Sequence, residues 1–263
     1  IEEGEVTPTT TYVDKGEVKV DEFTIKNSDG KAHGVQTMTQ VLEESLNTGA
    51  IFAKEQIGNK KFLEYLKSFG FGQPTGIELP EAKGSLDNLR LNIEVNYDTA
   101  SFGQGITVTP IQFIQAFSAF SNGGKMLRPY LVAEKIFADG RTEQTEPTVA
   151  RTVFSKQTAD NITSMLVGGV ENGHGKKAGV PGYYIAGKTG TAQIGSQNGK
   201  GYLEEVTIGS FAGYGPVEDP RFLMLVRVDR PAGVKFAEVT AAPAFGELAA
   251  FMLRYYNVPP TRK

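Results

Sequence analysis

A lysine followed by threonines and a glycine marks the segment Gly187–Ile194, which otherwise alternates like a β-strand. Thr189 and Thr191 lie two residues apart, so on a strand their hydroxyl groups point to the same face. Gly190 between them has no side chain that would keep a ligand off the backbone. Such an edge can pair with an extended peptide, while the hydroxyls and the ammonium group of Lys188 hold a carboxylate. On these residues alone, a turn beside a surface lysine is an equal alternative.

A serine and an asparagine two residues apart, Ser45 and Asn47, lie between two segments with helical periodicity. At a helix junction these residue types usually cap a helix or form a turn. Together with Lys188-Thr189-Gly190, however, S-x-N gives two of the three motifs of the serine enzymes that recognise penicillin. The combination, more than either motif, favours a chemical role for these residues.

The segment Gly182–Thr189 also fits the phosphate-loop pattern G-x-x-x-x-G-K-[ST] letter for letter. That motif needs a flexible loop after a strand and a helix that begins at the lysine. Here Tyr183, Tyr184 and Ile185 are bulky and favour a strand, and Gly190 stands where the helix should begin. Nucleotide binding is therefore the weakest interpretation, and binding of an ATP analogue would test it.

Five segments carry motifs or their flanks, in the order Leu42–Gly49, Ser101–Pro110, Ala186–Gln193, Ser210–Tyr214 and Ala241–Phe245. In this order they resemble the transpeptidase domain of the class B penicillin-binding proteins. The F-G-Q-G of the second segment is more specific than either short motif. The resemblance covers nearly the whole chain, and it implies that residues 1–263 form one transpeptidase domain that is truncated at its N-terminal side.

The family's first motif, S-x-x-K, occurs only as Ser28-Asp29-Gly30-Lys31. The family's serine and lysine face each other at i and i+3 of a helix, whereas Asn-Ser-Asp-Gly is a turn sequence. We predict a surface hairpin turn here, so the resemblance implies that the nucleophilic serine lies outside this chain. The start at Ile1 resembles the tail of the helix that bears S-x-x-K. We therefore expect a missing N-terminal segment or companion chain, and an inactive fragment on its own.

The resemblance implies a serine-type D-Ala-D-Ala transpeptidase. Such an enzyme cross-links peptidoglycan stem peptides ending in D-Ala-D-Ala through an acyl-serine intermediate, and β-lactam antibiotics stall it at the ester. A serine hydroxyl is a poor nucleophile and needs an adjacent base, which the missing lysine would supply. By the same resemblance, Lys188 polarises Ser45 and attracts the substrate carboxylate, Ser45 relays a proton to the leaving group, and Asn47 orients the missing lysine and the substrate amide.

The resemblance assigns substrate binding to Thr189, Gly190 and Thr191. The two hydroxyls would bind the terminal carboxylate, and the backbone N–H of Thr191 would form part of the oxyanion hole. Family members carry a membrane anchor and work in division or elongation with a glycosyltransferase and divisome or elongasome proteins. The expected location is therefore the extracytoplasmic face of the bacterial cell membrane.

Two further functions fit the same motifs. One is a serine β-lactamase or penicillin sensor, although the F-G-Q-G segment and the long region 70–108 stand against a β-lactamase; antibiotic turnover would favour it. The other is a non-catalytic scaffold that binds cell-wall peptides or division proteins.

Composition excludes several classes of function. The net charge of −3 and the pI near 5.6, without a basic patch, argue against nucleic-acid binding. The absence of cysteine excludes disulfides and cysteine-bound metals, and we expect both histidines, His33 and His174, to be loop residues. We expect no cofactor. No apolar run approaches the ~20 residues that cross a bilayer.

The hydrophobic pattern indicates an α+β fold, an antiparallel sheet flanked by helices. The resemblance implies that this is the penicillin-binding and serine β-lactamase-like transpeptidase fold. Short strands are expected within 9–26, helix over most of 36–69, and loops over 70–108. Later elements are a helix from Thr109-Pro110, a hairpin around Asp139-Gly140, a helix capped by Ser155, and strands at 183–194, 205–214 and 221–229. A closing helix over 243–256 would have one apolar face, made by Phe245, Leu248, Met252 and Tyr255. The stretch 195–201 reads as a mobile loop beside the site.

Overall fold

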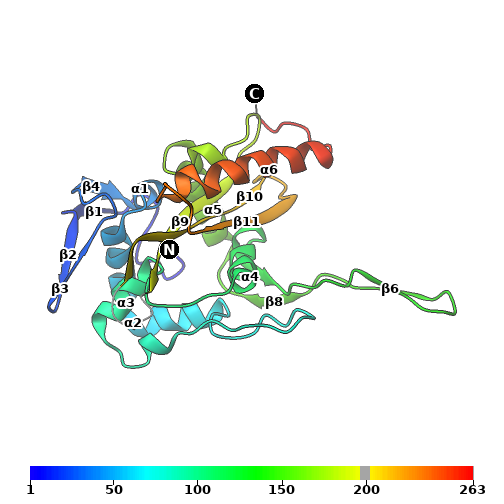
Figure 1. Ribbon diagram of the computed structural model, residues 1–263, viewed down its shortest axis with the longest axis horizontal. Coiled ribbons are helices and arrows are strands. Elements are labelled where there is room, and N and C mark those ends of the chain that lie inside the picture. Colours follow the sequence, from blue (N-terminus) through cyan, green and yellow to red (C-terminus); the bar gives the residue numbers. More distant parts are fainter. Residues whose placement is uncertain (196–201, 263) are drawn as a thin grey trace.

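A three-stranded antiparallel sheet forms the centre of the fold, with the strand order β11-β10-β9 (Figure 1). Its strands are β9 (Ala186–Gly195), β10 (Tyr202–Gly215) and β11 (Phe222–Asp229). The computed structural model describes residues 1–195 and 202–262, and within them no further strand pairs with β9 in this sheet. The predicted α+β arrangement and its three late strands are confirmed, and β9 has an open edge. Of the loop predicted at 195–201, Gly195 is the last residue of β9, and 196–201 lie outside the described residues.

In the described part of the chain, helices and four small sheets surround this centre. The helices are α1 (Met38–Glu43), α2 (Asn47–Ser68), α3 (Glu94–Ser101), α4 (Pro110–Ser121), α5 (Lys156–Glu171) and α6 (Ala241–Tyr255), with short 3-10 turns η1 (Asp87–Leu89), η2 (Lys176–Ala178) and η3 (Ala237–Val239). The paired short strands are β1 (Thr11–Asp14) with β4 (Gly34–Thr37), β2 (Glu17–Val20) with β3 (Phe23–Lys26), β5 (Lys125–Leu127) with β8 (Val149–Thr152), and β6 (Glu134–Ile136) with β7 (Thr142–Gln144).

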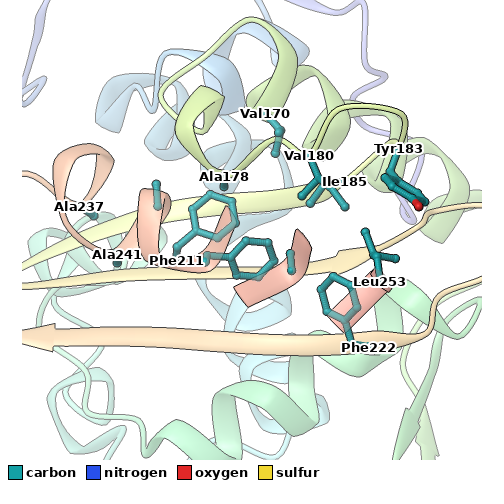
Figure 2. Packing of buried hydrophobic residues seen from close by; sticks show 13 residues of the cluster. Val170, Ala178, Val180, Tyr183, Ile185, Phe211, Phe222, Ala237, Ala241 and Leu253 are labelled. Atoms are coloured by element: carbon teal, nitrogen blue, oxygen red, sulfur yellow. The ribbon is translucent and has the colours of Figure 1, made fainter. Parts of the chain in front are cut away.

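Alternate residues of β10 face the two helical layers, as the period of a strand requires. Phe211 packs against Phe245 of α6, with ring centroids 4.6 Å apart, and Phe245 in turn packs against Phe222 of β11. Figure 2 shows Phe211, Phe222 and Leu253 in this one cluster. On the opposite face, Ala212 and Tyr214 pack against α4 and α5. The sheet is therefore a buried middle layer that fixes β9 between helices.

The inward face of α6 is made of smaller residues than the sequence pattern suggested. Phe245 is buried as expected, but Leu248 and Tyr255 are 47% and 69% exposed. Leu253 and a series of small residues are buried in their place: Ala241, Ala242, Gly246 and Ala249. The prediction followed side-chain size, whereas a helix packed this closely on its neighbours needs small side chains at the contact. A Cβ on Gly246, for example, would lie 2.7 Å from the carbonyl oxygen of Lys177 in η2.

Local capping signals place two of the helices correctly. Thr109 caps α4: its side-chain hydroxyl oxygen accepts a hydrogen bond from the N–H of Gln112, and Oε1 of Gln112 accepts one from the N–H of Thr109. Ser155 caps α5 by accepting from the N–H of Thr158. Both predicted starts are confirmed, because each depends on residues that are neighbours in sequence.

The region 70–108, predicted as loop, contains the helix α3. A buried ion pair joins it to α2: the ammonium group of Lys54 lies 2.5 Å from the carboxylates of both Glu94 and Asp98. Tyr97 is 2% exposed and donates a hydrogen bond to the carbonyl of Leu89. These long-range contacts, rather than helix propensity, account for α3.

Two predicted turns differ in their outcome. The hairpin around Asp139-Gly140 is confirmed as β6 and β7, which project from the body of the molecule at the right of Figure 1. Ser28-Asp29-Gly30-Lys31 is a turn, with Gly30 at φ 69°. It is not a hairpin turn, because β3 before it pairs with β2 and β4 after it pairs with β1.

Candidate active site

The structure brings the two sequence motifs together at the start of β9. The ammonium group of Lys188 donates a hydrogen bond to Oγ of Ser45 at 2.8 Å, across 143 residues of sequence. It also lies 3.1 Å from the carbonyl oxygen and 3.4 Å from Oγ1 of Thr189. An ammonium group has donors only, so Ser45 Oγ is the acceptor and its own proton remains free to donate elsewhere.

Ser45 occupies the short connection between α1 and α2, in a strained backbone conformation. Its φ is 55°, in the left-handed region that residues with a Cβ rarely adopt. The N–H of Leu46 closes the turn on the carbonyl of Val41 at 3.0 Å. Strain of this kind persists where surrounding contacts enforce it, and it is common at functional sites. The sequence contains no signal for this conformation.

Gly49 and Thr48 hold the first turn of α2 in place behind Ser45. A Cβ on Gly49 would lie 2.3 Å from Cγ2 of Val41, so only glycine lets α2 pack this closely on α1. The hydroxyl of Thr48 donates to the buried carboxylate of Asp14 at 2.7 Å, and Asn27 donates to the other oxygen of that carboxylate. Burial alone would raise the pKa of Asp14, but the hydrogen bonds outweigh it and hold the pKa below its usual range. Sequence analysis missed Asp14, because its partners are distant in sequence.

Asn47 is the first residue of α2, and its side-chain amide donates to the carbonyl of Lys26 at 2.8 Å. Asn47 lies close to the site, two residues after Ser45. Among the described contacts, however, its side-chain amide is hydrogen-bonded to the end of β3. Its predicted role toward the missing lysine stays a prediction.

Thr189, Gly190 and Thr191 follow Lys188 along β9. The register pairs Gly190 with Ser210 and Thr191 with Gly209 of β10. A Cβ on Gly190 would lie 2.7 Å from Oγ of Ser210, so a side chain at this position would require the Ser210 hydroxyl to turn away. The hydroxyl of Thr191 accepts a hydrogen bond from the N–H of Ala237 in η3 at 3.2 Å. Ala237 is a second neighbour of the site that sequence analysis missed.

Burial lowers the pKa of Lys188 to about 8, because a charged group loses hydration when it is covered by protein. Its three acceptors are neutral oxygens, and no described carboxylate contributes to its pKa. At neutral pH the side chain is still mostly an ammonium ion. Within the part of the chain that the structure describes, this cation has no counter-charge, which suits the binding of an anionic group.

The phosphate-loop interpretation fails on the observed structure, since Lys188 lies within a strand and no helix begins there. Among the described residues, no three histidine, aspartate or glutamate side chains are grouped to hold a metal ion. None of the described helices is long and apolar enough to cross a membrane.

The site residues and the fold match a known family. The model of the penicillin-binding protein transpeptidase domain matches residues 1–250. The chain belongs to the penicillin-binding protein transpeptidase family. Within this family, the resemblance to class B members is supported by the relatives described next.

Stage V sporulation protein D of Bacillus subtilis is 39% identical over 257 residues, which are 95% of this chain and 39% of that protein. Penicillin-binding protein PbpB of Mycobacterium tuberculosis is 32% identical over 98% of this chain and 40% of its own length. Among solved structures, penicillin-binding protein 3 of M. tuberculosis in complex with aztreonam has a TM-score of 0.90 and 29% identity, over 99% of this chain and 61% of that one. The chain thus spans about two fifths of the curated relatives it matches.

Proposed function

We propose that this penicillin-binding transpeptidase chain is part of a peptidoglycan D,D-transpeptidase that joins cell-wall stem peptides through an acyl-serine intermediate. The observation that carries the proposal is the 2.8 Å hydrogen bond from the buried ammonium group of Lys188 to Ser45, at the open edge of β9. A donor peptide can add to this edge as an extended strand, as peptides do at other open sheet edges. Its terminal carboxylate then lies against the cation and the hydroxyls of β9.

In the first half of the proposed reaction, a serine hydroxyl attacks the carbonyl of the D-Ala-D-Ala bond. The serine ester forms, the amide bond breaks, and the terminal D-Ala leaves as an amine that must gain a proton. Ser45 can supply it, because its hydroxyl accepts from Lys188 and so can donate to the leaving nitrogen. Lys188 then returns a proton to Ser45, and the proton that the attacking serine gave to its adjacent base replaces the one that Lys188 lost. In the second half, an amine of a neighbouring peptide attacks the ester and regenerates the serine.

The attacking serine of this scheme is not Ser28, which lies in a turn rather than facing Lys31 across a helical turn. We propose that it comes from a segment of the full-length protein outside these residues, and that residues 1–263 are the truncated remainder of one transpeptidase domain. The roles of Ser45, Asn47 and Lys188 in catalysis, and of Thr189, Gly190 and Thr191 in binding, belong to the same proposal. So do a membrane-anchored location outside the cytoplasm and cooperation with a polymerising glycosyltransferase.

The proposal is tested with a fluorescent penicillin and the full-length protein, read by denaturing gel and intact mass. We expect one covalent adduct per molecule that persists for many minutes. Preincubation with an unlabelled β-lactam should block it, and heat-unfolded protein should remain unlabelled. Incubation with a D-Ala-D-Ala peptide and an acceptor amine should release D-Ala and yield the joined peptide.

Each alternative has its own outcome in this experiment. Rapid loss of the adduct with release of hydrolysed antibiotic would identify a β-lactamase. A stable adduct without peptide joining would favour a penicillin sensor. No adduct at all would leave the non-catalytic scaffold and overturn the proposed reaction.

A further inference from the structure

A glycine-flanked histidine outside the sequence motifs connects the two halves of the site. His174 lies between α5 and η2, and its backbone N–H donates to the carbonyl of Glu43 at 3.2 Å. Glu43 is the last residue of α1, two residues before Ser45. The imidazole Nδ1 of His174 lies 2.7 Å from Oε2 of Glu238, in η3. One residue therefore contacts both the Ser45 side and the η3 side of the site.

The 3-10 turn η3 rests directly on the substrate-binding strand. Its Ala237 donates a backbone hydrogen bond to the hydroxyl of Thr191 at 3.2 Å. Gly209, the cross-strand partner of Thr191, makes this approach possible, because a Cβ there would lie 2.8 Å from Oγ1 of Thr240. The position of η3 thus sets the surroundings of Thr191.

The backbone around His174 is held tightly by its neighbours. A Cβ on Gly173 would lie 2.2 Å from the carbonyl oxygen of Glu43, and a Cβ on Gly175 would lie 2.8 Å from that of Gly169. His174 and Glu43 also line a small hollow, together with Lys188 and Thr189 of β9. His174 is therefore an anchored point from which its imidazole can hold η3.

The protons of this chain of contacts can be assigned from the chemistry of the groups. An ionised carboxylate only accepts hydrogen bonds, so Nδ1 of His174 carries the proton that Glu238 accepts. The hydroxyl of Thr191 accepts from Ala237, which leaves its own proton to donate. A hydroxyl oriented in this way is prepared to bind an anion, such as the carboxylate of a donor peptide or a penicillin.

We propose that His174 is a positioning residue for the transpeptidase reaction: through Glu238 it keeps η3 against β9, so that Thr191 offers its hydroxyl proton to the substrate carboxylate. This inference rests on the function proposed above. Because the side chains of His174 and Glu238 are 44% and 40% exposed, their pair contributes little to overall stability. Its loss should affect ligand binding far more than folding.

The test compares His174→Ala with the wild-type full-length protein, using benzylpenicillin and its methyl ester, which lacks the carboxylate. One oriented hydrogen bond contributes up to about a tenfold factor, so we expect about tenfold slower acylation by benzylpenicillin at low concentration. The loss should come from weaker binding, with the rate at saturation little changed. Acylation by the ester should be unaffected. His174→Asn, which keeps an N–H near the position of Nδ1, should restore most of the loss.

Two controls separate positioning from a structural role. Glu143→Ala removes an exposed ion pair with Lys135 on the β6–β7 hairpin. It should leave the rate of acylation unchanged with both benzylpenicillin and the methyl ester. If His174→Ala lowers the melting temperature, Glu238→Ala is used in its place, because it removes the same contact from the other side. It should slow acylation by benzylpenicillin and leave acylation by the ester unchanged.

Equal losses with benzylpenicillin and the ester, or no loss with either, would overturn the role of His174. Failure of the wild-type protein to form any adduct would instead overturn the proposed reaction, and the inference with it.

Discussion

Among the described residues, Lys54 and Lys188 each hold an ammonium group against protein oxygens, Lys54 buried and Lys188 partly buried, and their surroundings differ. Lys54, whose side chain is 1% exposed, lies between the carboxylates of Glu94 and Asp98. Burial alone would lower the pKa of Lys54, but the two carboxylates outweigh it and raise the pKa above its ordinary value. Among the described residues, Lys188 donates to hydroxyl and carbonyl oxygens alone, and burial lowers its pKa to about 8.

Whether a lysine charge serves the fold or the chemistry depends on its counter-charge. A charge with its counter-charge in place is already satisfied and joins two elements, here α2 and α3. A buried cation without one is unfavourable in the folded protein, and a bound anion relieves it. Lys188 is therefore expected to matter for ligands, and Lys54 for stability.

The largest effect is expected from Lys188→Ala in the full-length protein. Acylation by penicillin should fall about 100- to 10,000-fold, because the variant loses the cation and the donor to Ser45. The measurement is the rate of labelling with fluorescent penicillin. Lys176→Ala, at an exposed position of η2, is the matched control and should label normally. Labelling of the Lys188 variant at the wild-type rate would remove this lysine from the mechanism.

The next largest effect is expected on stability, from Lys54→Met. The substitution leaves the carboxylate of Asp98, 1% exposed, buried without its counter-ion. It should cost about 3–5 kcal/mol of unfolding free energy, measured by urea denaturation. The double variant Lys54→Met/Asp98→Leu should regain most of this loss, and folded molecules of either variant should still be acylated. A single variant as stable as the double one would show that the ion pair does not join α2 to α3.

The smallest effect has the opposite sign. Lys188→Met removes an uncompensated buried charge, so at pH 7 it should stabilise the protein by about 1–3 kcal/mol while abolishing activity. The pKa of Lys188 is about 8 in the folded protein against an ordinary value of 10.5, so the unfolded chain binds more protons between these values. The free energy of unfolding of the wild-type protein should therefore increase as the pH rises from about 8 to 10.5. The stability difference in favour of the Lys188→Met variant should become smaller over the same range.

Urea denaturation at pH 7 and pH 10 measures this change, with Lys177→Met, at an exposed lysine, as the control. A variant less stable than wild type at pH 7 would contradict the view that Lys188 is held at a cost to the fold.

Sequence alone supplied the parts of the fold whose causes are local. Thr109 and Ser155 cap their helices through residues three positions away, and β9 to β11 show their alternation directly. The helix α3 was missed, because its Asn, Asp, Thr and Ser residues are weak helix formers and distant contacts of Tyr97 and Asp98 hold it. The inward face of α6 was wrong, because close packing on the sheet selects alanine and glycine over the larger residues.

The site shows the same division. Residue types and spacing singled out Ser45 and Lys188, but not their contact, which joins segments 143 residues apart. The left-handed backbone of Ser45 and the hydrogen bond from Ala237 to Thr191 depend on the folded chain around them. Recognition of such a site from sequence therefore gives its reactive groups, while their orientation comes from residues that carry no motif.

The β6–β7 hairpin has a consequence for how the molecule opens. All residues of both strands are exposed, and the hairpin projects away from the packed layers in Figure 1. A two-stranded hairpin without a hydrophobic face is marginally stable by itself. Its amide protons therefore exchange with solvent through local fraying, whereas those of β10 are released only when the sheet itself comes apart. The arm can be cut or lengthened without loosening the layer that carries Lys188.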